Sequence, residues 1–142
     1  LTVSRMKSSK VGLKKESIQF SDMLKQEYAL FEDLIVQKGI DWNESITPDL
    51  CVVGDMALLQ KAINNLVSNA IAYSPEGSSI YLTAFAEEGA VRFLLENTGV
   101  HIPDSELPKL LGLYIVKTIL EQHQAKYSIE NTKRGVLFTI QF

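Results

Sequence analysis

The sequence is poor in cysteine and has no long hydrophobic run. Its single cysteine, Cys51, cannot form a disulfide within the chain, so a disulfide-stapled scaffold is excluded. Cys51 stands in the apolar run LCVV, which favours a buried structural thiol over a nucleophile. No uninterrupted apolar segment approaches the ~18 residues of a membrane-spanning helix, and we expect neither a signal peptide nor direct membrane contact from these residues.

A strong excess of one charge is also absent. Lys and Arg number 14 and Asp and Glu 17, and the resulting net charge of −3 gives no electrostatic reason to expect nucleic-acid binding. The length of 142 residues suits one domain with a real core. The chain opens on LTVSRMKSS without an initiator methionine, so we expect a piece of a longer protein.

Hydrophobic periodicity predicts three helices. The first has Ser21 as its expected N-cap and ends at the glycine signal Gly39. The second is capped by Asp55 and runs to Tyr73, just before the sequence SPEG. The third covers residues 110–124.

Alternating segments predict the strands. Short strands are expected at 16–20, 40–46 and 49–53, and two hairpins at 78–97 and 126–142. Interleaved helices and antiparallel hairpins favour an α/β fold, a two-layer sandwich in which helices cover one face of the sheet.

The second predicted helix carries a polar stripe beside its apolar one. Lys61, Asn65, Asn69 and Tyr73 recur every four residues, about 100° round from the apolar positions. Asparagine is a mediocre helix former, and a partly buried amide needs a hydrogen-bond partner. Either the fold supplies partners for the two amides, as caps of neighbouring loops, or a ligand does.

The segment NLVSNAIAY, from Asn65 to Tyr73, resembles the N-L-x-x-N-A-x-x-Y helix of the GHKL ATPase superfamily, more narrowly of the ATP-binding catalytic domain of bacterial sensor histidine kinases. The resemblance implies a Bergerat-type fold with a mixed, mostly antiparallel sheet and about three helices. It implies that Asn69 supplies its amide oxygen to Mg²⁺ bound by the ATP phosphates, since hard cations prefer oxygen ligands. Asn65 would be catalytic, holding phosphate or metal-bound water, and Tyr73 would line the nucleotide pocket.

A second motif, ENTGVHI, resembles the family's D-x-G-x-G-I loop, whose aspartate recognises the adenine amino group. The resemblance assigns nucleotide binding to Asn97, Gly99 and Ile102. Asn97 keeps an acceptor but lacks the charge, so we expect about tenfold weaker binding. His101 replaces a glycine and is expected to be an exposed loop residue, while Ala72 stands where the family often has a lysine.

A third motif is incomplete. The family's G-x-G-L-G-L box opens a helix so that backbone N–H groups meet the phosphates, and here only Leu111, Gly112 and Leu113 match it, as further nucleotide-binding residues. The mobile lid that precedes this box is absent. Three explanations stay open: a lid missing from this sequence between Leu110 and Leu111, which we favour, an engineered deletion, or a naturally lidless protein. The favoured one predicts a Cα separation there well above ~3.8 Å.

The resemblance also implies a domain division and partners. Residues 1–12 would end a dimerisation and phosphoacceptor hairpin with its linker, and residues 13–142 would form the ATP-binding domain. The kinase would pass the γ-phosphoryl group to a histidine on that upstream hairpin, for relay to a response regulator receiver domain, in a homodimeric full-length protein. The fragment would be the cytoplasmic domain of a membrane-anchored sensor. It is not expected to autophosphorylate, because His123 is a surface or packing residue and not the acceptor.

Two rival interpretations remain. One is a related GHKL enzyme such as an anti-sigma serine kinase, against which the LTVSRMKSS lead-in argues. The other is a degenerate GHKL domain that acts as a non-catalytic docking scaffold, which Asn97, Ala72, His101 and the missing glycines favour.

Overall fold

The computed structural model describes residues 13–103, 106 and 113–142. The predicted lead-in at 1–12 and the junction of Leu110 with Leu111 lie outside them. The described elements, in chain order, are β1 (Lys15–Gln19), α2 (Phe20–Gln37), β2 (Asp41–Ile46), β3 (Cys51–Asp55), α3 (Met56–Tyr73), β4 (Ser79–Glu87), β5 (Ala90–Thr98), α4 (Leu113–Gln122), β6 (Lys126–Asn131) and β7 (Gly135–Gln141).

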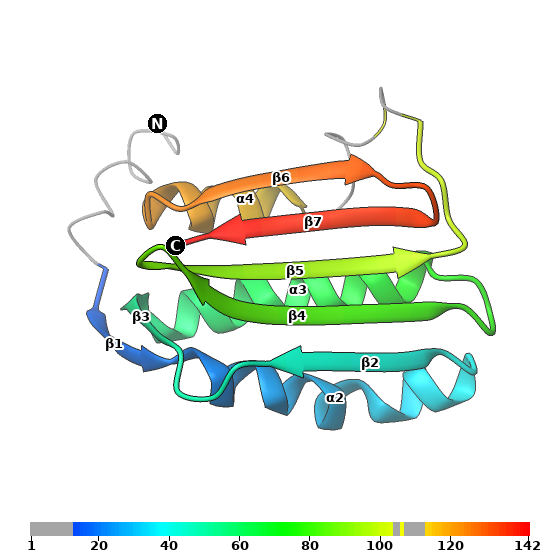
Figure 1. The fold of residues 1–142 in the computed structure, drawn as a ribbon, viewed down its shortest axis with the longest axis horizontal. Coiled ribbons are helices and arrows are strands. Elements are labelled where there is room, and N and C mark those ends of the chain that lie inside the picture. Colours follow the sequence, from blue (N-terminus) through cyan, green and yellow to red (C-terminus); the bar gives the residue numbers. More distant parts are fainter. Residues whose placement is uncertain (1–12, 104–105, 107–112) are drawn as a thin grey trace.

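The main sheet has five strands in the order β2-β4-β5-β7-β6, and β1 pairs with β3 in a separate two-stranded sheet. Only β2 and β4 are parallel among these pairs; the other neighbours are antiparallel. Figure 1 shows α2, α3 and α4 on the same side of the main sheet, and no described helix covers the opposite face. The predicted fold class, a two-layer α/β sandwich with a mixed sheet covered on one face, is confirmed.

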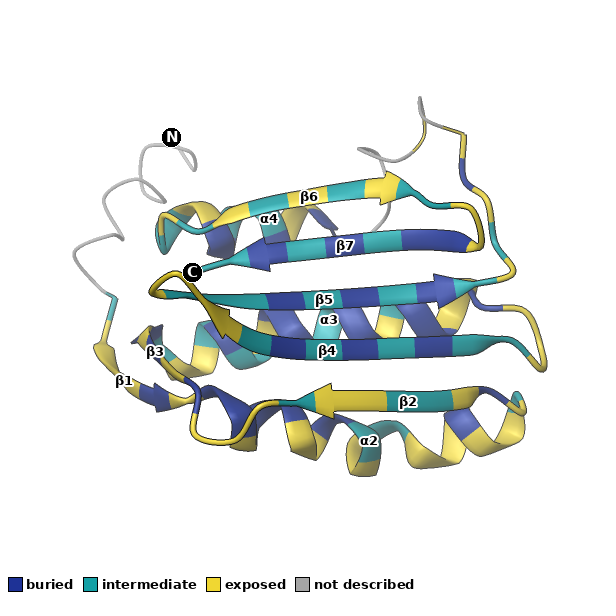
Figure 2. Cartoon of the chain, viewed as in Figure 1, coloured by how far each residue is buried: buried dark blue, intermediate teal, exposed yellow. Residues whose placement is uncertain are grey.

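The core lies between this sheet and the helices. Strands β4 and β5 alternate buried and half-buried residues, with Ile80, Leu82 and Phe93 fully buried (Figure 2). This period of two places every second side chain against the helices. The apolar stripe of α3 is buried as predicted, at Leu59, Ala62, Ile63, Leu66, Val67, Ala70 and Ile71.

The two predicted N-caps have different outcomes. Asp55 does cap α3, since its carboxylate accepts a hydrogen bond from the backbone N–H of Leu58 at 3.1 Å. The Ser21 prediction is wrong: α2 begins at Phe20, so Ser21 lies inside its first turn. The Ser21 hydroxyl donates to the carbonyl of Thr47 at 2.6 Å and accepts from the N–H of Leu50 at 2.8 Å. The side chain therefore ties α2 to the turn between β2 and β3.

The prediction of a buried Cys51 is also wrong, because its side chain is exposed. Strand β3 belongs to a two-stranded sheet in which Val52 points inward while its neighbours point outward.

His123 is a packing residue, as predicted. Its Nε2 accepts from the N–H of Asp55 at 3.0 Å and its Nδ1 lies 2.7 Å from the carbonyl of Ile119, which fits a neutral ring protonated on Nδ1. No helix in the described part of the chain is long and apolar enough to cross a membrane.

Candidate functional site

A cavity lies between the C-terminal half of α3, the end of β5 and the first residue of α4. Five residues predicted from the sequence meet there: Asn69, Tyr73, Asn97, Ile102 and Leu113. The rest of its lining is apolar and consists of Leu66, Ala70, Leu95, Ile129, Val136 and Phe138. The structure thus brings α3, which carries Asn69 and Tyr73, next to the loop after β5, although the two segments are far apart in sequence.

Helix α3 brings Asn69 and Tyr73 to the cavity because they lie one turn apart on one face. Asn69 is half-buried and already engaged in an interaction with another residue. Tyr73 is 41% exposed, so its ring stands at the rim. Asn65, one turn earlier, is half-buried but does not line the cavity.

Asn97 is a buried polar side chain at the end of β5. Only 6% of the residue is exposed, and β5 pairs it with Ile80 of β4 on one side and Val136 of β7 on the other. Its side chain lines the cavity, and no described residue forms a hydrogen bond with that carboxamide. Such an amide costs free energy unless a ligand or solvent satisfies it.

The loop that follows Asn97 is held by its backbone. Gly99 has a φ of +77°, a conformation that favours glycine, and its N–H donates to the carbonyl of Arg134 at 2.9 Å. Gly99 is exposed and does not line the cavity. Farther along, the side chain of Asn131 accepts from the N–H of Ile102 at 3.1 Å and donates to its carbonyl at 2.5 Å. Sequence reasoning missed Asn131, and no local pattern marks it.

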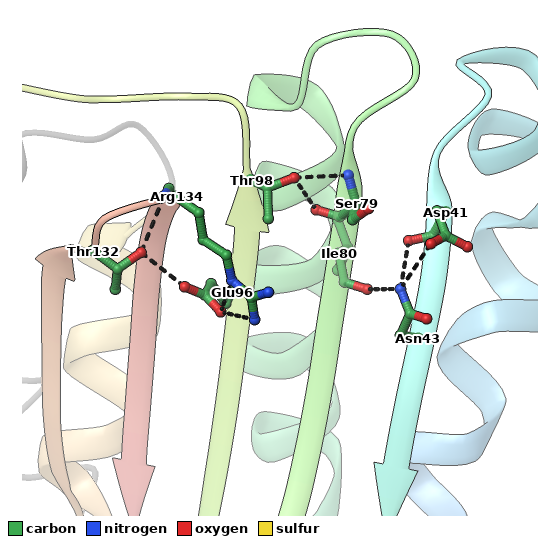
Figure 3. A network of polar contacts seen from close by, with 9 residues as sticks. Asp41, Asn43, Ser79, Ile80, Glu96, Thr98, Thr132 and Arg134 are labelled. Atoms are coloured by element: carbon green, nitrogen blue, oxygen red, sulfur yellow. Dashed lines mark hydrogen bonds and ion pairs between the residues drawn. The ribbon is translucent and has the colours of Figure 1, made fainter.

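The turn between β6 and β7 is fixed to β5 by Glu96 (Figure 3). The Thr132 hydroxyl donates to one carboxylate oxygen at 2.8 Å, and the Arg134 guanidinium donates to the other at 2.8 and 3.1 Å. Burial alone would raise the pKa of Glu96, but these hydrogen bonds and the charge of Arg134 together hold it below its usual value. The guanidinium also lies 4.2 Å above the ring of Tyr81.

The remaining predicted residues are placed as follows. His101 is exposed, as predicted, and its φ is not in the left-handed region, so the loop accepts its Cβ without strain. Leu111 and Gly112 lie outside the described residues. Within the described chain, no group of three or more His, Cys, Asp or Glu residues could hold a metal ion, so a cation here would depend on amide oxygens and on ligand atoms.

The cavity is small and mostly apolar. Its volume is about 40 Å³, room for water but not for a purine unless the walls move apart. Its polar lining residues are Asn69, Tyr73 and Asn97. This combination of an apolar slot and a few fixed polar groups is typical of small-molecule sites.

Comparison with known proteins gives a family match. Residues 54–142 match the model of the family "Histidine kinase-, DNA gyrase B-, and HSP90-like ATPase". The chain is 28% identical to the sensor histidine kinase CusS of Escherichia coli K12, over 89% of this chain and 30% of that protein. It is 31% identical to the heme sensor protein HssS of Staphylococcus haemolyticus, over 91% of this chain and 35% of that protein. The chain therefore spans about a third of the length of these relatives.

Solved structures agree in fold. The catalytic domain of histidine kinase ThkA superposes with a TM-score of 0.83 at 28% identity, over 91% of this chain and 96% of that one. A structure of ThkA in complex with the response regulator protein TrrA superposes with a TM-score of 0.81 at 24% identity, over 99% of this chain and 47% of that one.

Proposed function

The chain belongs to the histidine kinase-, DNA gyrase B- and HSP90-like ATPase family, and from that premise we propose that it is the ATP-binding catalytic domain of a sensor histidine kinase. One observation carries the proposal. The family's two sequence signatures, on α3 and after β5, converge on one cavity through Asn69, Tyr73, Asn97 and Ile102. Residues 13–142 form the domain in this proposal, and residues 1–12 lead into it from an upstream hairpin.

The residues present fit Mg·ATP. The unpartnered carboxamide of Asn97 offers hydrogen bonds to a base that enters the apolar slot, with Ile102 and Leu113 against the ring and Tyr73 at the rim. Asn69 would present its amide oxygen to Mg²⁺, and Asn65, one turn farther, would orient phosphate or metal-bound water. Bound Mg·ATP supplies the phosphoryl group and neutralises its charge, and the chain's own part is positioning. Leu111 and Gly112, which lie outside the described residues, would bind the phosphates in this proposal.

The acceptor of the phosphoryl group lies outside this chain. Neither histidine suits the role, since His123 is hydrogen-bonded inside the fold on both ring nitrogens and His101 is an exposed residue of the base-binding loop. The proposed acceptor is a histidine on the upstream dimerisation hairpin of a homodimeric sensor, with a response regulator receiver domain next in the relay. The ThkA–TrrA complex of a protein with the same fold supports that partner. Because ATP is a cytoplasmic substrate, we place the domain on the cytoplasmic side of a membrane-anchored sensor.

A second candidate is a non-catalytic docking scaffold. The apolar lining, the cavity volume of about 40 Å³ and Ala72 in place of a lysine favour it. In this case the chain would bind nucleotide weakly or not at all.

Phosphoryl transfer in trans separates the candidates. The chain is mixed with Mg²⁺, γ-labelled ATP and the separately produced hairpin of its full-length protein. The kinase predicts label on the hairpin histidine and none on the chain alone. Absence of label on the hairpin, in conditions where an active relative labels its own hairpin, would contradict the kinase and favour the scaffold.

A further inference from the structure

The backbone of Asn97 is held in place, but its side-chain carboxamide is not. Strands β4 and β7 flank Asn97 on both sides, and a Cβ on Gly135 would lie 1.8 Å from the Asn97 carbonyl oxygen, so β7 runs unusually close there. The backbone position is therefore fixed. The side chain lines the cavity with no hydrogen bond from any described residue.

The groups around this amide do not select its orientation. Most residues of the cavity wall are apolar, among them Leu66, Ile102 and Val136, and the two other polar residues there, Asn69 and Tyr73, form no hydrogen bond with Asn97. The terminal torsion of an asparagine is broad and roughly two-fold, so the oxygen and the NH₂ group can exchange places. A rotation of 180° costs no protein hydrogen bond here.

Purines differ in the order of donor and acceptor on their Watson–Crick edge. Adenine has an amino donor beside the N1 acceptor, and guanine has an N1–H donor beside the O6 acceptor. A carboxamide carries one acceptor and one donor group side by side, so it pairs with adenine in one orientation and with guanine in the other. A carboxylate only accepts: when it faces position 6 of the base it pairs with the adenine amino group, but it sets negative charge against O6 of guanine.

We propose that the nucleotide site is permissive for the purine base, with Asn97 pairing with guanine as well as adenine, so that the chain takes GTP in addition to ATP. This inference rests on the proposed function, because it concerns the same cavity. It identifies Asn97 as the residue that sets base selectivity. Replacement by aspartate restores an acceptor-only group and with it a preference for adenine.

Isothermal titration tests the proposal directly. Dissociation constants for Mg·ATP and Mg·GTP are measured on the unmodified chain and on Asn97→Asp. We expect the two constants of the unmodified chain to agree within about tenfold, and the preference for ATP to increase at least about tenfold in Asn97→Asp. Gln141→Glu is the matched control: it makes the same amide-to-carboxylate change on β7, beside Arg92 and Lys126 in register, and leaves the ratio unchanged.

The outcomes are distinct. A preference for ATP above about tenfold in the unmodified chain overturns base permissiveness and leaves the kinase assignment intact. An unchanged ratio in a folded Asn97→Asp overturns the role of Asn97. If the variant does not fold, by circular dichroism, the ratio in the unmodified chain decides alone. Absence of binding by either nucleotide contradicts the proposed function itself.

Discussion

The side chain of Asn131 holds the backbone of Ile102 from both sides, accepting from its N–H at 3.1 Å and donating to its carbonyl at 2.5 Å. Ile102 lines the cavity, and Asn131 ends strand β6. Together with the bond from the Gly99 N–H to the Arg134 carbonyl, this contact makes the β6–β7 turn the support of the loop that follows Asn97.

Asn131→Ala is expected to weaken nucleotide binding, although Asn131 does not line the cavity. The substitution removes two half-buried hydrogen bonds to the backbone of Ile102, each contributing about 1 kcal/mol, and so frees the loop. We expect Mg·ATP affinity to fall about tenfold in an isothermal titration. Asn43→Ala is the control, since Asn43 also bonds to backbone carbonyls, of Asp41 and Ile80, at the far edge of the sheet. Equal affinity in Asn131→Ala and the unmodified chain would contradict this role.

Gly135→Ala is expected to destabilise the fold. The added Cβ would lie 1.8 Å from the Asn97 carbonyl oxygen, so β5 and β7 must separate at the cavity wall. We expect a loss of about 2 kcal/mol or more in urea unfolding.

Gly89→Ala serves as the comparison for that variant. Gly89 has a φ of +79° but open space around the new Cβ, so Gly89→Ala should lower the free energy of unfolding by only about 1 kcal/mol. Equal losses in the two variants would show that the close contact with Asn97 contributes nothing.

Glu27 gives the fold a pH dependence. This carboxyl is fully buried between α2 and α3, where Gln60 donates to it at 3.2 Å and the side-chain amide of Asn64 lies 2.6 Å away. Burial raises its pKa from 4.5 to about 7, against a smaller lowering by the Gln60 hydrogen bond. When the Glu27 carboxyl is protonated, it can donate a hydrogen bond to the side-chain oxygen of Asn64. When it is ionised, the Asn64 amide must rotate so that its NH₂ group donates to the carboxylate.

Because the folded-state pKa of Glu27 is above the unfolded one, its favourable contribution is fully present below about pH 4.5 and is lost as pH rises through about 7. The loss amounts to about 3 kcal/mol at most. Glu27→Gln should therefore be more stable than the unmodified chain at pH 8 and close to it at pH 5, by urea unfolding. Glu32→Gln, on the exposed face of α2, should show no such difference. A stability gap independent of pH would refute the assignment to Glu27.

Regular periodicity explains what the sequence could predict. Asn69 and Tyr73 meet at the cavity because a helix fixes residues one turn apart, and Asp55 caps α3 because capping is local. Contacts across 29 residues, such as Asn131 with Ile102, leave no local signal. The burial of Cys51 was mispredicted for a related reason: an apolar run does not reveal that β3 pairs with β1 alone among the described strands and exposes alternate side chains.

The central claim, that α3 and the loop after β5 together hold Mg·ATP, is tested most directly by titrating ATP with and without Mg²⁺ into the unmodified chain, Asn69→Ala and the control Ser68→Ala. Ser68 is the exposed neighbour of Asn69 on the same helix. The account predicts micromolar affinity that depends on Mg²⁺ in the unmodified chain and in Ser68→Ala, and loss of that dependence in Asn69→Ala. Millimolar or undetectable binding, or an Asn69→Ala variant that keeps the full response to Mg²⁺, would contradict it.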